Sequence, residues 1–174
     1  MKGRALHASI NQTEVGTLQE VDGLWSFQYE ADWLSRADGF ALSPHLPLTA
    51  EPLLDGASKR PVQWYFDNLL PEEGQRVLLA GDAKLDAADA FSLLAWYGAE
   101  SAGSVTLLQA DAEPQTAGAL RSLPDDALEA RIRQLPKAPL TQAAIKRMSL
   151  AGAQHKLAVV FQDDALFEPA GATP

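Results

Sequence analysis

The sequence of 174 residues contains no cysteine, and its three histidines, His7, His45 and His155, are scattered along the chain. The absence of cysteine excludes disulfides, thiolate metal sites and cysteine nucleophiles. The spacing of the histidines matches no pattern of metal ligands. The sequence therefore predicts no metal-ligand cluster.

Long apolar runs are also absent. No stretch approaches the ~20 apolar residues that a membrane-spanning helix needs. The opening Met1-Lys2-Gly3-Arg4 is not followed by the apolar block of a secretion signal. We therefore expect a cytoplasmic protein without membrane contact. Hydrophobic residues still make up 47% of the chain, which is enough for the core of one ordinary domain or two small ones.

Basic residues are scarce in most of the chain. Residues 1–136 carry ten Lys and Arg against twenty Asp and Glu, whereas residues 137–174 carry four against three. Because affinity for nucleic acid depends on Lys and Arg that neutralise phosphates, this balance argues against direct DNA binding. Any contact with DNA is expected through a partner.

The first third has the pattern of antiparallel strands joined by tight turns. Strands are expected at residues 4–10, 15–18 and 24–29, with turns at 11–12 and 22–23. Trp25, Phe27 and Tyr29 alternate with polar residues, as in a half-buried strand. An alternative is that Trp25 and Tyr29 stack on nucleic-acid bases, although no Lys or Arg is interleaved with them.

Helices are expected after a crossing loop at residues 43–61, which is rich in Pro and Gly. The expected elements are a helix opened by Pro61, helices at about 72–79 and 87–97, and a strand at 104–109. Asp86 is the expected cap of the helix at 87–97. Glu72 and Glu73 favour a helix N-terminus through its dipole. Their alternative role as a catalytic acid–base pair conflicts with the different directions of adjacent helical side chains.

A shift to small, acidic, Gly- and Pro-bearing residues near 110–120 is interpreted as a linker. We expect an N-terminal subdomain at 1–109, a linker at 110–121 and a second unit at 122–174. A helix is expected after Pro124 with an apolar stripe of Leu128, Ile132 and Leu135, and a short helix near 141–146. The predicted fold class is α+β, a small antiparallel sheet with packed helices.

A loop of small residues precedes the apolar run at 157–161. Gly152 tolerates dihedrals that larger residues resist, and Ala151 and Ala153 allow close approach, so backbone N–H groups can turn toward an anion such as phosphate. A polar turn and a returning strand follow at 162–167. A small-residue loop leading into a hairpin is the arrangement of the nucleotide-covering loop in a protein-kinase N-lobe. A plain hairpin without a nucleotide role is the alternative.

The segment Ser149-Leu150-Ala151-Gly152-Ala153-Gln154-x-Lys156 closely resembles the Gly-rich loop of HipA-type serine/threonine kinases, the toxins of bacterial toxin–antitoxin systems. Further motifs resemble the N-terminal region of that family in the same order: Val15-Gly16-Thr17-Leu18, Phe27-x-Tyr29, Trp33-Leu34, Leu42-Ser43, Leu46-Pro47-Leu48, Phe66-x-Asn68-Leu69-Leu70-Pro71-Glu72, Gly98 and Gly103. The resemblance covers essentially the whole chain.

The resemblance implies an ATP- and Mg²⁺-dependent kinase of bacterial persistence that phosphorylates a protein serine, typically on an aminoacyl-tRNA synthetase. It implies nucleotide-binding backbone amides at Leu150, Ala151, Gly152, Ala153 and Gln154. It also implies autophosphorylation of Ser149, which would switch the kinase off because it adds nearly two negative charges beside the loop. For Ser149, a turn hydroxyl that bonds its own backbone is the alternative.

In that family the catalytic Lys, the catalytic Asp and the Mg²⁺ ligands follow the hairpin, and this chain stops at Pro174 without them. We therefore expect a truncated kinase with no catalytic residue and no strong binding of ATP or Mg²⁺ on its own. Expected partners are a HipB-type antitoxin, through which DNA would be contacted, the remainder of the kinase core and the protein substrate. The alternative is a non-enzymatic interaction module, a separate N-terminal subunit that binds a kinase core or an antitoxin.

Overall fold

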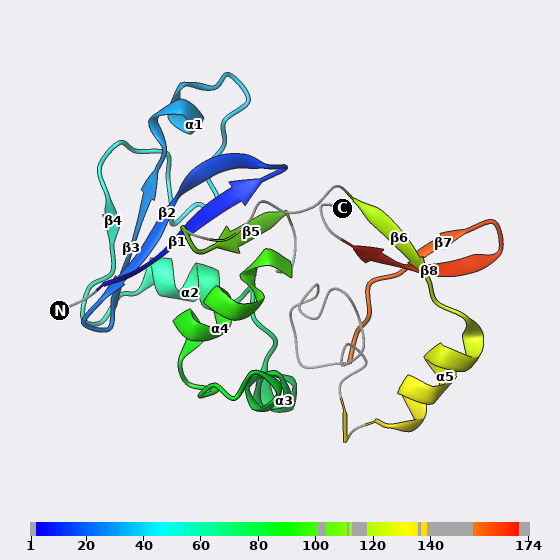
Figure 1. Cartoon of the computed structure of the whole chain (residues 1–174). Helices are drawn as coiled ribbons and strands as arrows, with labels where there is room; N and C mark the ends of the chain where they lie inside the picture. Colours follow the sequence, from blue (N-terminus) through cyan, green and yellow to red (C-terminus); the bar gives the residue numbers. More distant parts are fainter. Residues whose placement is uncertain are drawn as a thin grey trace.

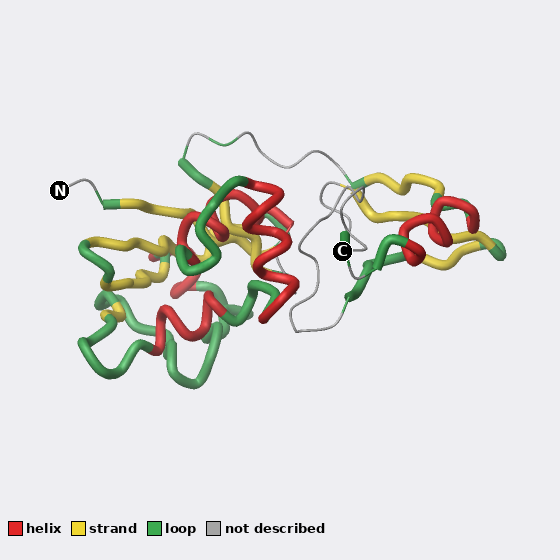
Figure 2. Tube along the Cα trace, turned by 90° about the horizontal axis from the view of Figure 1, so that it is seen from below, coloured by secondary structure: helices red, strands yellow, loops and turns green. Residues whose placement is uncertain are grey.

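The computed structural model of the chain describes residues 3–100, 104–110, 112, 118–135, 137–138 and 155–170. Their helices and strands form two lobes, which both views in Figures 1 and 2 show apart from each other. The first lobe has a five-stranded sheet and the second a three-stranded sheet. The fold is α+β with small antiparallel sheets and packed helices, as the sequence predicts.

The first lobe contains the expected strands and helices in order, but its second strand is longer than the expected 15–18 and a short helix at 31–35 was not expected. Its elements are β1 (Arg4–Ile10), β2 (Thr13–Val21), β3 (Leu24–Tyr29), α1 (Ala31–Ser35), β4 (Leu53–Leu54), α2 (Pro61–Asp67), α3 (Glu73–Ala83), α4 (Ala90–Tyr97), the 3₁₀ helix η1 (Gly98–Glu100) and β5 (Val105–Leu108). The sheet order is β4-β3-β2-β1-β5, and all paired strands are antiparallel. β4 lies within the segment that was expected to be a crossing loop.

The hairpin turns explain why the strand boundaries could be predicted. Asn11 and Gln12 have φ values of 49° and 64°, and Asp22 and Gly23 have 53° and 77°. Two-residue loops with both residues in the left-handed region match the right-handed twist of the flanking strands. Asn, Asp and Gly tolerate this conformation best, so the polar pairs mark the turns in the sequence.

Gly16, in the motif that begins at Val15, allows β2 and β3 to approach closely. A Cβ atom at this position would lie 2.3 Å from the carbonyl oxygen of Gln28 and 2.6 Å from the ring of Phe27. Any larger residue would force the backbone of β3 to move. The motif therefore reflects strand packing rather than a binding site.

The core lies between the sheet and helices α2 and α4. Trp25, Phe27 and Tyr29 are all buried, as their alternation predicts. The Phe27 ring contacts Tyr29 at 5.0 Å and Phe66 of α2 at 5.3 Å between centroids. The Tyr29 hydroxyl donates to the Leu46 carbonyl at 2.6 Å. Because Trp25 and Tyr29 are buried, the alternative of a stacking platform for bases is wrong.

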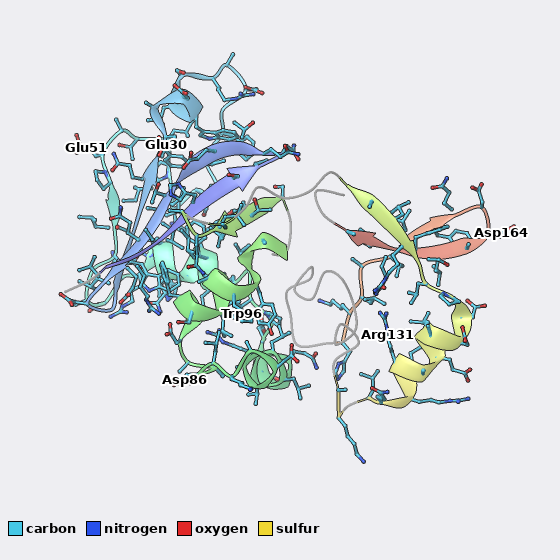
Figure 3. The ribbon with its side chains drawn as sticks, in the orientation of Figure 1. Glu30, Glu51, Asp86, Trp96, Arg131 and Asp164 are labelled. Atoms are coloured by element: carbon cyan, nitrogen blue, oxygen red, sulfur yellow. The ribbon has the colours of Figure 1, made fainter. Side chains whose placement is uncertain are left out.

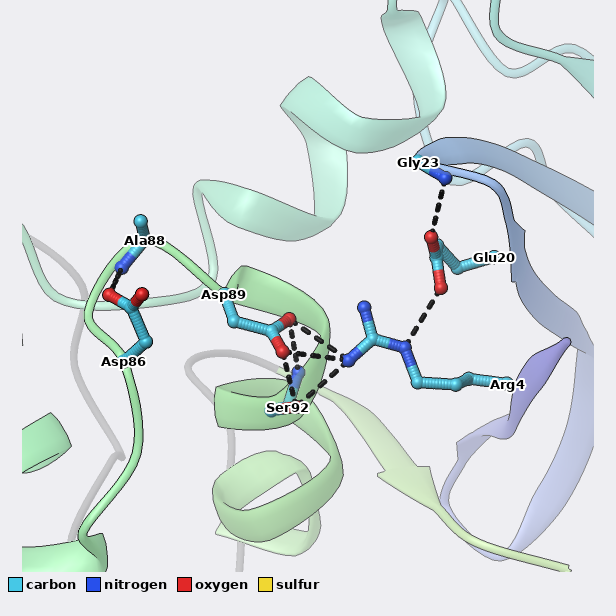
Figure 4. A network of polar contacts seen from close by, with 7 residues as sticks. All are labelled: Arg4, Glu20, Gly23, Asp86, Ala88, Asp89 and Ser92. Carbon is cyan, nitrogen blue, oxygen red and sulfur yellow. Dashed lines mark hydrogen bonds and ion pairs between the residues drawn. The ribbon is translucent and has the colours of Figure 1, made fainter. Parts of the chain in front are cut away.

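The N-terminus of α4 differs from the expectation. The helix begins at Ala90 and is capped by Asp89, whose carboxylate accepts from Ser92 N at 3.1 Å and from Ser92 Oγ at 2.6 Å. Asp86, the expected cap, accepts from Ala88 N at 2.8 Å in the preceding turn (Figure 4). α3 also runs further than expected and ends where Lys84 adopts a left-handed φ of 56°.

The contacts of Arg4 explain why Asp89, and not Asp86, caps α4. The guanidinium of Arg4 donates to Glu20 Oε2 on β2 and to Asp89 Oδ2, each at 2.8 Å (Figure 4). It also lies 4.8 Å from the centroid of the Phe91 ring. Partial burial of Asp89 raises the pKa of its carboxyl, but hydrogen bonds from Arg4 and Ser92 outweigh that effect and lower it to about 2. This network joins the first strand to α4.

The second lobe contains β6 (Ala119–Ser122), α5 (Asp125–Arg133), β7 (Val160–Gln162) and β8 (Ala165–Ala170), with sheet order β6-β8-β7. β6 begins within the segment expected to be a linker. It pairs with β8, so the hairpin that follows the apolar run at 157–161 gains a third strand from within this chain. The helix expected at 141–146 lies outside the described residues.

The apolar stripe expected on α5 forms no buried face. Ile132 is 51% exposed, and Leu128 and Leu135 are only partly buried. No described residue of this helix is fully buried. The contact of α5 with the sheet is instead made by a charged side chain, Arg131.

Candidate functional site

The predicted nucleotide-binding residues Leu150, Ala151, Gly152, Ala153 and Gln154 lie outside the described residues, as does the predicted autophosphorylation site Ser149. The structure describes the segment that follows them in the sequence, from His155 to Ala170.

The hairpin of β7 and β8 follows the loop directly. Val160 pairs with Phe167 and Gln162 with Ala165. The two-residue turn is formed by Asp163 and Asp164, with φ values of 50° and 57°. It is the same kind of turn as in the first two hairpins of the chain, and it was expected from the polar residues at this point. The strand expected at 157–161 is shorter and begins only at Val160.

Glu168 of β8 is the centre of the second lobe. Its side chain is 2% exposed and accepts from Arg131 Nη1 at 2.6 Å. Arg121 of β6 donates to the same carboxylate through Nε at 3.1 Å and through Nη2. Figure 3 shows Arg131 on the side of α5 that faces the small sheet. One carboxylate thus joins β6, β8 and α5.

The protonation of Glu168 is fixed by its partners. Burial raises the pKa of the carboxyl, but hydrogen bonds from Arg131 and Arg121 outweigh burial and leave the pKa below its ordinary value. A carboxylate held charged by two guanidinium groups is a poor proton donor or acceptor. We therefore assign Glu168 a structural role, which sequence reasoning missed because its partners are 37 and 47 residues away.

His155 connects the start of this segment to the first lobe. Its Nε2 lies 3.0 Å from Nε2 of Gln75 on α3. No pattern in the sequence indicates this contact, because a single histidine and a glutamine 80 residues earlier form no motif.

In the described part of the chain, no group of three or more His, Asp or Glu side chains could hold a metal ion. Among the same residues, no helix is long and apolar enough to cross a membrane.

These observations define an α+β protein in which a helix-covered, five-stranded antiparallel sheet is followed along the chain by a small three-stranded antiparallel sheet with one helix. Comparison with known proteins is consistent with this class. The family model described as HipA N-terminal domain matches residues 6–108. The chain belongs to the HipA family, and this region is its N-terminal domain.

Two relatives support the assignment. The chain is 39% identical over 158 residues to a protein of Sinorhizobium fredii (strain NBRC 101917 / NGR234) named "Putative kinase Y4mE", covering 87% of this chain and 36% of the relative. It is similar in fold to a chain of the toxin–antitoxin complex of HipA, HipB and operator DNA from Shewanella oneidensis MR-1. That match has a TM-score of 0.67 and 22% identity, and it covers 96% of this chain and 38% of the other. The chain thus spans little more than a third of the length of either relative.

Proposed function

We propose that this chain is the N-terminal part of a HipA-type toxin kinase of a toxin–antitoxin system, which phosphorylates a serine of a protein substrate. The observation that supports it most is the match to Ser149–Gln154 immediately before a hairpin that packs in its own small sheet. The kinase named in Sinorhizobium fredii resembles the chain over both lobes. An aminoacyl-tRNA synthetase is the proposed substrate, from the family resemblance alone.

In this proposal the backbone amides of Leu150 to Gln154 bind the nucleotide phosphates, and Ser149 is the autophosphorylation site. ATP with Mg²⁺ would supply the phosphoryl group when bound to the complete kinase. We propose no residue of this chain as a ligand of Mg²⁺, because the resemblance implies that the metal ligands of such kinases follow the hairpin. Positioning and electrostatic stabilisation supply nearly all phosphoryl-transfer catalysis, and the chain alone is therefore proposed to be inactive.

A chimera tests this proposal. Residues 1–170 would be joined to the part of the Sinorhizobium relative that lies beyond the match, and incubated with labelled ATP. We expect the chimera to incorporate label and the 174-residue chain to incorporate none. Ser149→Ala should abolish labelling of the chimera itself, whereas Ser58→Ala, at an exposed serine of the first lobe, should not. Labelling of the isolated chain, or an unlabelled chimera that is folded, would contradict the proposal.

The second candidate function is a non-enzymatic interaction module. It is favoured by one observation: the core of the first lobe is closed within residues 6–107, so this lobe has a complete core without a kinase. The proposed partner in either case is a HipB-type antitoxin, by analogy with the Shewanella complex, and DNA would be reached through it. Binding of an antitoxin by a chain that fails the chimera test would favour the module.

A further inference from the structure

An aspartate followed by glycine occurs three times in the sequence, each time in the first lobe: Asp22-Gly23, Asp38-Gly39 and Asp55-Gly56. Such a pair is prone to isomerise, because glycine has no side chain that hinders attack of its backbone nitrogen on the preceding carboxyl group. The reaction needs a free carboxyl group and room for the backbone to rotate. The three pairs are chemically alike, so their surroundings in the fold decide which of them reacts.

The pair at Asp55 is fully engaged. Asp55 is only 6% exposed. Its Oδ1 accepts from Val62 N at 2.9 Å and its Oδ2 from Gln63 N at 3.0 Å, in the first turn of α2. Gly56 N donates to the Lys59 carbonyl at 2.8 Å. Both reacting groups of this pair are therefore held by other partners.

The pair at Asp38 is exposed, but a neighbouring arginine holds its carboxylate. Oδ1 and Oδ2 of Asp38 accept from Nε and Nη2 of Arg36, each at 2.9 Å. These bonds lower the pKa of the Asp38 carboxyl, so less of the neutral acid, the form that loses water in the reaction, is present. A Cβ atom at Gly39 would lie 2.6 Å from the Trp33 carbonyl oxygen, so the backbone there has little room to rotate.

The pair at Asp22 lacks these restraints. Asp22 is exposed in the turn between β2 and β3, and among the described residues no hydrogen bond or ion pair holds its carboxyl group. A Cβ atom at Gly23 would meet nothing within 4 Å, so this backbone has room to rotate. Gly23 N donates to Glu20 Oε1 at 2.6 Å, and Arg4 holds the other oxygen of Glu20 at 2.8 Å (Figure 4).

We propose that Asp22-Gly23 is the site at which this protein isomerises to isoaspartate, and that Glu20 restrains the reaction. The Gly23 nitrogen forms a bond to Cγ of Asp22 and releases its proton. The carboxyl hydroxyl leaves with that proton as water, and a succinimide ring results. Water then breaks the bond between this nitrogen and the α-carbonyl carbon of Asp22. The main chain now runs through the Asp22 side chain, and the α-carboxylate is free.

The modification changes the hairpin. It adds one carbon to the main chain of a two-residue turn whose geometry matches the twist of its flanking strands. Val21 pairs with Leu24 next to this turn, and Arg60 Nη1 donates to the Gly23 carbonyl at 3.0 Å. We expect the modified turn to lose both contacts. The free α-carboxylate distinguishes the product from ordinary aspartate, and it is the group that isoaspartate-specific methyltransferases esterify.

Prolonged warm incubation of the folded 174-residue chain in mildly acidic buffer tests the assigned site. Peptides that contain positions 22, 38 and 55 are then separated, and isoaspartate is measured by fragment-ion mass spectrometry and by enzymatic methylation. We expect about tenfold more isoaspartate at position 22 than at either other position, since their carboxylates must first give up two hydrogen bonds. In urea that unfolds the chain, the three positions should react at similar rates.

Variants of Glu20 test the restraint. Glu20→Ala should raise the rate at position 22 by about three- to tenfold, the range of one lost hydrogen bond, and leave positions 38 and 55 unchanged. Glu20→Gln, which keeps an acceptor oxygen, should stay close to the wild-type rate. The rates at 38 and 55 also show whether each variant is folded, because unfolding raises all three.

Equal isoaspartate at the three positions of the folded chain, or more at 38 or 55 than at 22, would overturn the assigned site. A preference for position 22 that persists in urea would also overturn it, because the fold would then not be the cause. A wild-type rate at position 22 in Glu20→Ala would overturn the restraint by Glu20.

Discussion

The two lobes differ in the interactions that stabilise the interior of each. In the first lobe, buried apolar side chains from β1, β2, β3, β5 and α1 to α4 form one continuous cluster. In the second, the described residues that are buried are Leu123, Glu168 and Pro169, and the centre is a carboxylate bound by two arginines. Apolar burial contributes directly to folding free energy, whereas a buried ion cluster fixes geometry and adds little net stability. The comparison indicates a self-sufficient first lobe and a second lobe whose shape is defined but weakly stabilised.

The largest expected effect is the loss of an aromatic side chain from the first core. Phe27 is fully buried between Tyr29 and Phe66, and Phe27→Ala should lower the free energy of unfolding of the first lobe by about 3–5 kcal/mol. Urea unfolding followed by tryptophan fluorescence measures this change. Phe161→Ala is the matched control, because Phe161 is 68% exposed in the second lobe. An equal shift in both variants would refute the assignment of the core.

A smaller effect is expected when the ion cluster is broken. Glu168→Gln removes the charge that Arg121 and Arg131 share, and should destabilise the second lobe by about 1.5–3 kcal/mol. Amide exchange across 165–170 should accelerate, while the fluorescence transition of the first lobe stays in place. Glu129→Gln, in an exposed pair with Arg133, should leave both unchanged. If Glu168→Gln lowers the stability of the first lobe, followed by fluorescence, as much as that of the second lobe, followed by exchange, the two lobes do not unfold independently.

The smallest effect is the pH dependence of the network around Asp89. Its pKa in the folded chain, about 2, lies below the ordinary 3.8, so its ionised form stabilises the fold. This contribution is complete above pH 3.8 and is lost as the pH falls through about 2. The stability difference between wild type and Asp89→Asn should therefore shrink between pH 5 and pH 2. When both chains also carry Arg4→Gln, this stability difference should depend less on pH. An unchanged dependence on pH would contradict Arg4 as the partner of Asp89.

Local chemistry made the strands of the first lobe predictable. The boundaries expected for β1 and β3 are confirmed, because the turn residues at 11–12 and 22–23 tolerate the left-handed region in which they lie. The burial of Phe27 followed from simple alternation with polar neighbours. These features depend on residues that are adjacent in sequence.

The features that could not be predicted depend on partners that lie far apart in the sequence. Asp86 and Asp89 are equally good caps by type, and Arg4, which is 85 residues away in the sequence, selects Asp89. The start of β6 was interpreted as linker because it follows the small, acidic region near 110–120, and its pairing with β8 is specified 47 residues away at Glu168. The loop residues Ser149 to Gln154 came from resemblance to a family, and their role stays a prediction together with the domain boundaries.

Hydrogen exchange of the whole chain across a urea series tests the central claim most directly. The account predicts two transitions: peptides from 119–135 and 155–170 lose protection at low urea, and peptides from β1, β2, β3 and α4 lose it together at higher urea. Loss of protection in both lobes at one shared urea midpoint would contradict the account, because it would show a single cooperative unit instead of two.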